Sequence, residues 1–158
     1  MTLRDAINIL NATMSDTSTY FGEKDTLDPI HHLLGTAFGW GGQPKKDAVY
    51  LNFVPEKNDG KTAYTLTVKD VPVDAFWSVI VYNKESWIVK NSRDIYSYND
   101  VTAKKAADGS ITIHFGGDPK ADNYLEIMEG WNYMVRLYQP KKEILDGSWK
   151  FPEPKVVQ

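Results

Sequence analysis

The chain contains no cysteine among its 158 residues. Disulfide bridges, thiolate nucleophiles and thiolate metal ligands are therefore excluded together. Long apolar runs are also absent, because no stretch approaches the ~18 apolar residues that a membrane-spanning helix needs. We therefore expect no membrane span and no cofactor that is held by cysteine.

An excess of positive charge is missing as well. The chain has 18 Lys and Arg against 21 Asp and Glu, which gives a formal net charge of −3. The basic pairs at 45–46, 104–105 and 141–142 are far apart in the sequence and have acidic neighbours. Nucleic-acid binding requires clustered Lys and Arg that neutralise phosphates, so we expect no nucleic-acid partner.

Histidine is scarce, with three residues in the whole chain. His31 and His32 are adjacent on a predicted helix, so their side chains diverge by about 100° and suit a single metal ion poorly. His114 alternates with Ile113 and Phe115 and is expected to face outward beside Thr112. The sequence therefore predicts no metal site and no cofactor.

The first residues do not resemble a secretory signal, because 1–5 carry Arg4 and Asp5 and no apolar run. This favours the cytoplasm. If an export signal had been removed from the sequence given, the periplasm would be the compartment. The compartment is left open between these two.

Aromatic residues are abundant, at 13% of the chain, with five Trp and nine Tyr. Large flat side chains favour strands and fill the cores of β-sandwiches. A length of 158 residues is that of one ordinary domain. Composition alone thus favours one globular unit that is rich in strands.

Helical periodicity is confined to the first 40 residues. One helix is predicted over residues 2–14, with an apolar stripe at Leu3, Ala6, Ile7, Leu10 and Met14. A second begins at Asp28, a suitable N-cap, followed by Pro29 at the first helical position. Its buried face is predicted to comprise Ile30, Leu33, Leu34, Ala37 and Phe38. We accordingly predict a helical lead-in over residues 1–37 and a single β-sandwich domain over 38–158, for which the strand pattern is given next.

From residue 48 onward, apolar residues alternate with a period of two, which indicates strands. The turn signals between these segments are Asn58-Asp59-Gly60, Asp108-Gly109 and Gly116–Pro119. The predicted strands are 48–54, 62–69, 75–83, 87–90, 110–115, 124–128 and 131–139, with a further edge strand at 155–157. Short strands at this spacing predict a mainly β, antiparallel sandwich.

Five stretches occur together in a characteristic order: 41–50, 73–82, 91–97, 107–110 and 136–150. Together they resemble the bacterial domain-of-unknown-function family 1214, which is often the C-terminal partner of family 1254 in longer proteins. The resemblance covers about residues 38–154 and implies a jelly-roll-like β-sandwich. The family has no established activity, so the resemblance implies no catalytic residues.

Polar and aromatic residues in these stretches are the candidate site residues: Asp74, Tyr82, Arg93, Tyr96, Arg136 and Tyr138. Asp74 is either a turn-capping carboxylate or a general base at a pocket rim. Arg136 and Tyr138 share one face of the last long strand. Arg136 either forms a structural ion pair, with Asp74 or Asp146, or binds an anionic ligand.

Two other groups of polar residues have ordinary structural explanations. Asp146-Gly147-Ser148-Trp149 lacks the Gly-x-Ser-x-Gly pattern of a nucleophilic serine, so we predict a turn whose Trp149 packs on the core. Glu126 and Glu129 could form a carboxylate pair for glycoside chemistry, but exposed charges at strand ends are the better explanation.

Three hypotheses for function remain open. The first is a module that binds a small-molecule or carbohydrate-like ligand, with aromatic rings for stacking and arginines as polar anchors. The second is a metal-independent hydrolase or lyase that uses Asp, Tyr and Arg in a pocket. The third is a structural assembly domain, a homo-oligomer that associates through residues 1–14.

Overall fold

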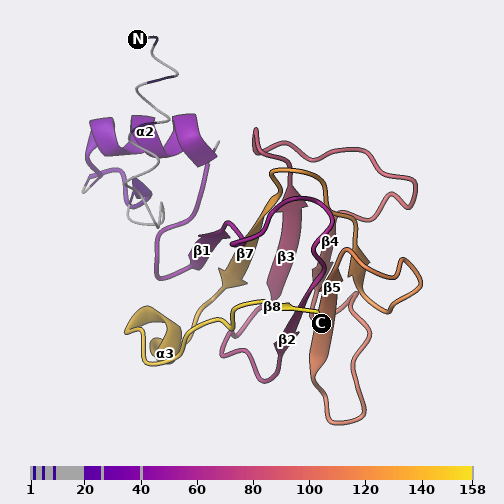
Figure 1. Cartoon of the computed structure of the whole chain (residues 1–158). Helices are drawn as coiled ribbons and strands as arrows, with labels where there is room; N and C mark the ends of the chain where they lie inside the picture. Colours follow the sequence, from indigo (N-terminus) through magenta and orange to yellow (C-terminus); the bar gives the residue numbers. More distant parts are fainter. Residues whose placement is uncertain are drawn as a thin grey trace.

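The computed structural model describes residues 2, 5, 9, 20–25, 27–39 and 41–157, without the side chains of residues 38 and 39. Most of the helix predicted over 2–14, all of its apolar stripe and therefore its proposed role in assembly lie outside the described residues. The chain continues through helix α2 (Pro29–Gly39) into the strands, and the short helix α3 (Lys142–Leu145) precedes the last of them (Figure 1).

Eight strands form two four-stranded sheets in the described part of the chain. The first sheet has the order β1 (Ala48–Phe53), β7 (Asn132–Tyr138), β3 (Trp77–Tyr82) and β4 (Ser97–Asn99). The second has the order β6 (Tyr124–Leu125), β5 (Ile111–Phe115), β2 (Tyr64–Val68) and β8 (Lys155–Val156). The β5–β6 pair is parallel and the other pairs are antiparallel. The predicted mainly β sandwich is confirmed, and its jelly-roll connectivity stays a prediction.

The core lies between the two sheets, and strand alternation explains how it forms. On β7, Tyr133, Val135 and Leu137 are fully buried, whereas the residues between them are half-buried on the opposite face. Leu66 and Ile113 face them from the second sheet. All six residues of β3 are buried, as predicted for a central strand. His114 is half-buried between the core residues Ile113 and Phe115, in agreement with its predicted outward direction.

A stack of aromatic rings joins the two sheets inside this core. Phe115 of the second sheet packs against Trp131 and Tyr133, with ring centroids 5.1 and 5.0 Å apart. Tyr133 also stacks on Phe53 of β1 at 4.9 Å. Such pairs contribute about 0.5–1.5 kcal/mol each beyond the apolar area they bury. The high aromatic content of the sequence is thus used mainly between the sheets.

Helix α2 begins as predicted, but its predicted buried face is wrong. The carboxylate of Asp28 accepts hydrogen bonds from the backbone N–H groups of Ile30 and His31 at 2.8 and 2.9 Å, and these bonds lower its pKa. Ile30 and Leu33 are nevertheless about two-thirds exposed. The helix packs on Tyr20 and Phe21 through another side, because these rings contact its histidines (centroids 5.0 and 5.7 Å). Among the described residues, no helix has the length and apolarity needed to cross a membrane.

The strand predicted at residues 87–90 is not formed. Asn83 closes a tight turn there, because its side-chain oxygen accepts the N–H of Trp87 at 2.8 Å while its own N–H donates to the Trp87 carbonyl at 3.0 Å. Trp87, Ile88 and Val89 are 39–51% exposed, so apolar character alone misled the prediction. The strand that pairs with β3 on the side opposite β7 is instead β4, whose short polar sequence Ser-Tyr-Asn gave no signal.

Asn123 is the buried polar residue that ties the loop before β6 to the core. Its side-chain oxygen accepts the Lys104 N–H at 2.7 Å, and its amide donates to the carbonyls of Lys104 and Thr112 at 2.9 Å each. Its φ of 53° lies in the left-handed region, which Asn tolerates better than most residues.

We expect Asn123→Ala to lower the free energy of unfolding by about 2–4 kcal/mol, because it leaves buried backbone groups without partners and strains the backbone. Urea denaturation would measure the loss. Asn52→Ala, at an exposed position, is the matched control and should change stability by less than about 0.5 kcal/mol. Equal effects of the two substitutions would contradict the structural role of Asn123.

Tyr133 is fully buried, and its hydroxyl has no hydrogen-bond partner in the described part of the chain. We expect Tyr133→Phe to leave stability at pH 7 unchanged or to raise it by about 1 kcal/mol, because an unsatisfied polar group is removed. Burial raises the pKa of Tyr133 above its ordinary value of 10. The natural fold should therefore lose stability as the pH rises above about 10, where the unfolded phenol ionises, and the variant should lose less.

Tyr64→Phe provides the matched control in the same denaturation series. The hydroxyl of Tyr64, another buried residue, accepts the backbone N–H of Lys57 at 2.9 Å. Its removal should therefore cost about 1 kcal/mol at pH 7. A loss at Tyr133 as large as that at Tyr64 would show that the Tyr133 hydroxyl has a partner.

Candidate functional site on the outer face of the first sheet

The outer face of the first sheet carries a row of polar side chains from four strands. The strand registers place Tyr50 of β1 beside Arg136 of β7, Arg136 beside Ser78 of β3, and Ser78 beside Asn99 of β4. Arg136 lies between the inward-facing Val135 and Leu137, so its own side chain lies on the outer face. The buried core thus fixes the position of the guanidinium.

Arg136 is half-buried, and its guanidinium Nη2 donates a 2.7 Å hydrogen bond to the hydroxyl of Tyr82. No carboxylate of the described residues forms an ion pair with it. The predicted ion pair with Asp74 or Asp146 is wrong. Asp74 lies 3.3 Å from Lys141 instead, and Asp146 accepts the backbone N–H of Ser148 at 2.9 Å in its own turn.

Aromatic residues lie beside Arg136 on the outer face of the sheet. Tyr138, two residues along β7 on the same face, stacks on Phe76 with centroids 4.5 Å apart and meets Tyr50 edge-on at 6.4 Å. Burial and the neighbouring Tyr138 raise the pKa of Tyr50, and the positive charge of Arg136 partly opposes this shift. The phenol of Tyr50 is therefore neutral and able to donate a hydrogen bond at physiological pH.

This arrangement has a definite chemical capacity. A guanidinium without a carboxylate partner offers several N–H donors in a plane that matches a carboxylate or phosphate group. The neighbouring rings offer apolar faces and hydroxyl groups. Phe76 is 40% exposed, whereas Arg136, Tyr50 and Tyr138 are half-buried. The cluster formed by Tyr50, Phe76, Tyr82, Arg136 and Tyr138 is called the Arg136 cluster below.

Of the six residues predicted from the sequence, the structure brings Tyr82, Arg136 and Tyr138 together. Tyr50 was missed, because it comes from a strand far from β7 in the sequence. Alternation in the 48–53 segment does place Tyr50 opposite in direction to Val49 and Leu51. The pairing of β1 with β7, which brings Tyr50 to Arg136, has no local signal.

Arg93 and Tyr96 belong to a different surface. Arg93 is exposed, donates to the carbonyl of Pro119, and lies over the ring of Tyr124 at 5.4 Å from its centroid. The hydroxyl of Tyr96 donates to the Asp94 carboxylate at 2.9 Å, and this bond raises the pKa of Tyr96. Both side chains therefore have partners within or beside their own loop.

Asp74 is exposed at the start of the β3 segment, where its N–H donates to the Gln139 carbonyl at 2.9 Å. Its ion pair with Lys141 is a surface one, with side chains 66% and 48% exposed, and such pairs are weak. The predicted turn at 146–149 is confirmed, since Trp149 packs against the core and Ser148 is exposed. Glu126 and Glu129 are exposed.

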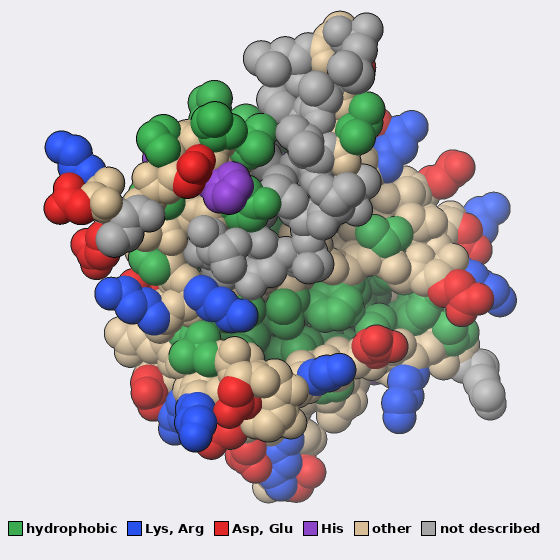
Figure 2. Space-filling model, turned by 90° about the vertical axis from the view of Figure 1, so that its left-hand side faces the viewer, with side chains coloured by type: hydrophobic (Ala, Val, Ile, Leu, Met, Phe, Trp, Pro, Cys, Tyr) green, Lys and Arg blue, Asp and Glu red, His purple; other side chains and the backbone are tan. Residues whose placement is uncertain are grey.

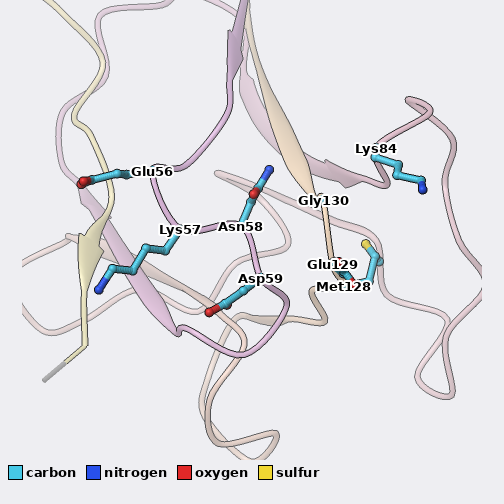
Figure 3. Close-up of a pocket in the computed structure, with 8 residues that line it drawn as sticks. All are labelled: Glu56, Lys57, Asn58, Asp59, Lys84, Met128, Glu129 and Gly130. Atoms are coloured by element: carbon cyan, nitrogen blue, oxygen red, sulfur yellow. The ribbon is translucent and has the colours of Figure 1, made fainter.

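A wide hollow of about 760 Å³ lies elsewhere, at one end of the sandwich (Figure 3). Its walls come from the β1–β2 connection, the β3–β4 connection and the turn before β7. Figure 3 shows Glu56 and Lys57 extending away from Lys84, so the charged groups do not converge. The carboxylate of Asp59 is used locally, because it accepts hydrogen bonds from the backbone N–H groups of Lys61 and Thr62 at 2.9 and 2.7 Å. This hollow lacks the converging polar groups of a binding site.

The backbone is tightly packed at this hollow. Gly60 has a φ of 72°, and a Cβ atom there would lie 2.6 Å from the backbone of Met128 and Glu129. The predicted Asn58-Asp59-Gly60 turn therefore serves as a close crossing between β1 and β2, which lie in different sheets. Among the described residues, no group of three or more His, Asp or Glu side chains could hold a metal ion.

The comparisons with known proteins agree with this fold. The model of a family described as "Protein of unknown function (DUF1214)" matches residues 50–142. The VPA0106 protein of Vibrio parahaemolyticus has a similar crystal structure, with a TM-score of 0.73, 28% identity, and coverage of 98% of this chain and 42% of that one. No curated protein matches the chain.

A crystal structure of an uncharacterised protein from Burkholderia cenocepacia is similar in fold, with a TM-score of 0.55 and 20% identity. The similarity covers 75% of this chain and 31% of that one. This chain therefore spans less than half the length of either solved structure. The two solved structures share the fold of this chain, and each contains additional residues that this chain does not match.

The bond between Tyr82 and Arg136 can be tested directly. We expect Tyr82→Phe to lower the free energy of unfolding by about 1.5–3 kcal/mol, because it removes a hydrogen bond to a half-buried charge. Tyr96→Phe is the matched control, since its hydroxyl bonds an exposed carboxylate, and should cost less than about 0.5 kcal/mol. Urea denaturation of both variants at pH 7 would measure the difference. Equal losses would show that the Arg136 cluster is not held by this bond.

Proposed function

The chain belongs to the DUF1214 family of proteins of unknown function, and from that premise we propose that it is a binding module for a small anionic ligand. The site is the Arg136 cluster. The ligand class is a small molecule with a carboxylate or phosphate group and a ring-shaped body, such as an acidic sugar. The observation that carries the proposal is the half-buried guanidinium of Arg136, whose partner is a tyrosine hydroxyl and which forms no ion pair with a carboxylate of the described residues.

A half-buried positive charge is costly when nothing neutralises it. The hydrogen bond that the guanidinium donates to the Tyr82 hydroxyl orients it but adds no negative charge. An incoming anion would supply that charge and accept two parallel N–H bonds. The arrangement therefore favours an anion over a neutral molecule of the same shape.

The aromatic residues suit the remainder of the ligand. Phe76 and Tyr138 are stacked and present a broad apolar surface beside Arg136. Sugar rings and other flat bodies pack on such surfaces, and tyrosine hydroxyls supply polar contacts. The sequence suggested a small-molecule or carbohydrate-like ligand. The proposal narrows this class of ligand to acidic molecules.

The alternative, a metal-independent hydrolase or lyase, stays a prediction that nothing tests. It would use Asp74, Tyr82, Arg93, Tyr96 or Arg136 around one pocket. The Asp74 carboxylate pairs with Lys141, and Arg93 and Tyr96 lie on another surface than Arg136, which supports binding over catalysis.

Glucuronate and glucose provide a matched pair of probes, because they differ in the carboxylate. We expect glucuronate to raise the melting temperature and to bind at least tenfold more tightly than glucose in calorimetric titration, a difference of about 1.4 kcal/mol or more. Galacturonate, benzoate and inorganic phosphate extend the panel to other anions. Equal binding of glucose and glucuronate, or no thermal shift with any anion at 10 mM, would contradict the proposal.

Two variants locate the site. Arg136→Met keeps the length of the side chain and removes its charge, so it should weaken anion binding at least tenfold. Arg93→Met is the control, because Arg93 lies on another surface beside Tyr124, and should change affinity less than twofold. Equal effects of the two substitutions would place the anion elsewhere.

A further inference from the structure

A cavity of about 290 Å³ lies between β1 and the C-terminal segment that leads to β8. Most of the side chains that line it are apolar. They include Val49, Leu51 and Phe53 of β1, Ile144 of α3, and Trp149 and Phe151 of the C-terminal segment. Figure 2 shows hydrophobic side chains gathered in a hollow on the side of the molecule where β1 and α3 lie, with basic and acidic side chains at its border. Water finds few hydrogen-bond partners between apolar walls, so the cavity favours an apolar body.

Two charged residues of opposite sign also line this cavity. Lys150 and Glu153 lie on either side of Phe151 in the chain, and they are the charged members of the lining. Neither forms an ion pair with another of the described residues. The charges at the cavity therefore balance, and they match a ligand that carries one positive and one negative group beside an apolar body.

The carboxylate of Glu153 acts on the interior as well as on the solvent. The ring of Tyr133 stacks on Phe53, which lines the cavity, with ring centroids 4.9 Å apart. Burial and, after it, the negative charge of Glu153 raise the pKa of the Tyr133 phenol. A carboxylate whose field reaches an apolar interior attracts a cation there more strongly than one surrounded by water does.

We propose that this cavity binds a free α-amino acid with an apolar side chain, such as phenylalanine or leucine. The side chain of the ligand enters the apolar cavity, its ammonium group meets Glu153, and its carboxylate meets Lys150. Ligand pockets usually measure about 300–1,000 Å³, so a cavity at the lower end suits a molecule of this size. The proposal is independent of the Arg136 cluster, because Tyr50 faces the opposite side of β1 from Val49 and Leu51.

Matched ligands test which groups are recognised. We expect phenylalanine to bind with a dissociation constant of about 1 mM or below in calorimetric titration. Phenylalanine amide lacks the carboxylate, N-acetylphenylalanine lacks the ammonium charge, and glycine lacks the apolar body, so each should bind about fivefold or more weakly. The two derivatives also resemble the ends of a peptide and so distinguish a peptide from a free amino acid. Equal binding of either derivative, or no binding of phenylalanine and leucine at about 10 mM, would overturn the proposal.

Charge-removing variants locate the site without disturbing the core. Lys150→Met and Glu153→Gln change exposed positions, and each should weaken phenylalanine binding about threefold or more. Lys155→Met, at an exposed lysine outside the cavity lining, and Arg136→Met should change it less than about twofold. Glucuronate binding should be unchanged in the two cavity variants, which separates this site from the Arg136 cluster. Equal effects of Lys150→Met and Lys155→Met, or loss of phenylalanine binding in Arg136→Met, would overturn the proposal.

Filling the cavity provides a further test. Ile144→Trp adds a large ring to the cavity wall and should weaken phenylalanine binding about fivefold or more. Val101→Trp is the matched control, because Val101 is 81% exposed and does not line the cavity. Melting temperatures of both variants would show that they are folded. An Ile144→Trp variant that is folded and keeps the natural affinity would contradict binding in this cavity.

Discussion

The rest of the structure depends on the aromatic stack between the two sheets. Phe115 enters from the second sheet and packs against both Tyr133 of the first sheet and Trp131, which precedes β7. Three large rings in contact fix the spacing of the sheets and the register of β7 relative to the core. No hydrogen bond to a described residue contributes at the Tyr133 hydroxyl, so ring shape and apolar burial hold the two layers together.

One strand connects this core to the candidate site. On β7, alternate residues enter the stack and the core, and the residues between them include Arg136 and Tyr138 on the outer face. A strand that is rigid on its buried side holds its outer side chains in place as well. The position of the guanidinium is therefore a direct consequence of the packing beneath it, and the hydrogen bond that it donates to the Tyr82 hydroxyl completes its orientation.

Local patterns in the sequence were sufficient for most strands and for the start of α2. Alternation identified β1, β2, β3, β5 and β7 closely, and Asp28-Pro29 identified the helix start. Predictions from local sequence patterns were wrong where tertiary contacts determine the structure of a segment. The apolar 87–90 segment follows a turn that Asn83 closes at Trp87 and forms no strand. Ile30 and Leu33 are exposed because α2 packs through another side. The contact between Tyr50 and Arg136 depends on a pairing between distant strands, which no local pattern contains.

The strand order has a consequence for biosynthesis. β7 lies between β1 and β3 in the first sheet, although it comes after six other strands in the chain. During translation, β1 and β3 emerge early and remain without this shared neighbour until residues 132–138 have been made. Both edges of the uncharged β1 are then available to other nascent chains, and exposed edges of this kind promote aggregation. The first sheet is thus completed late, and we expect the emerging chain to depend on chaperones until then.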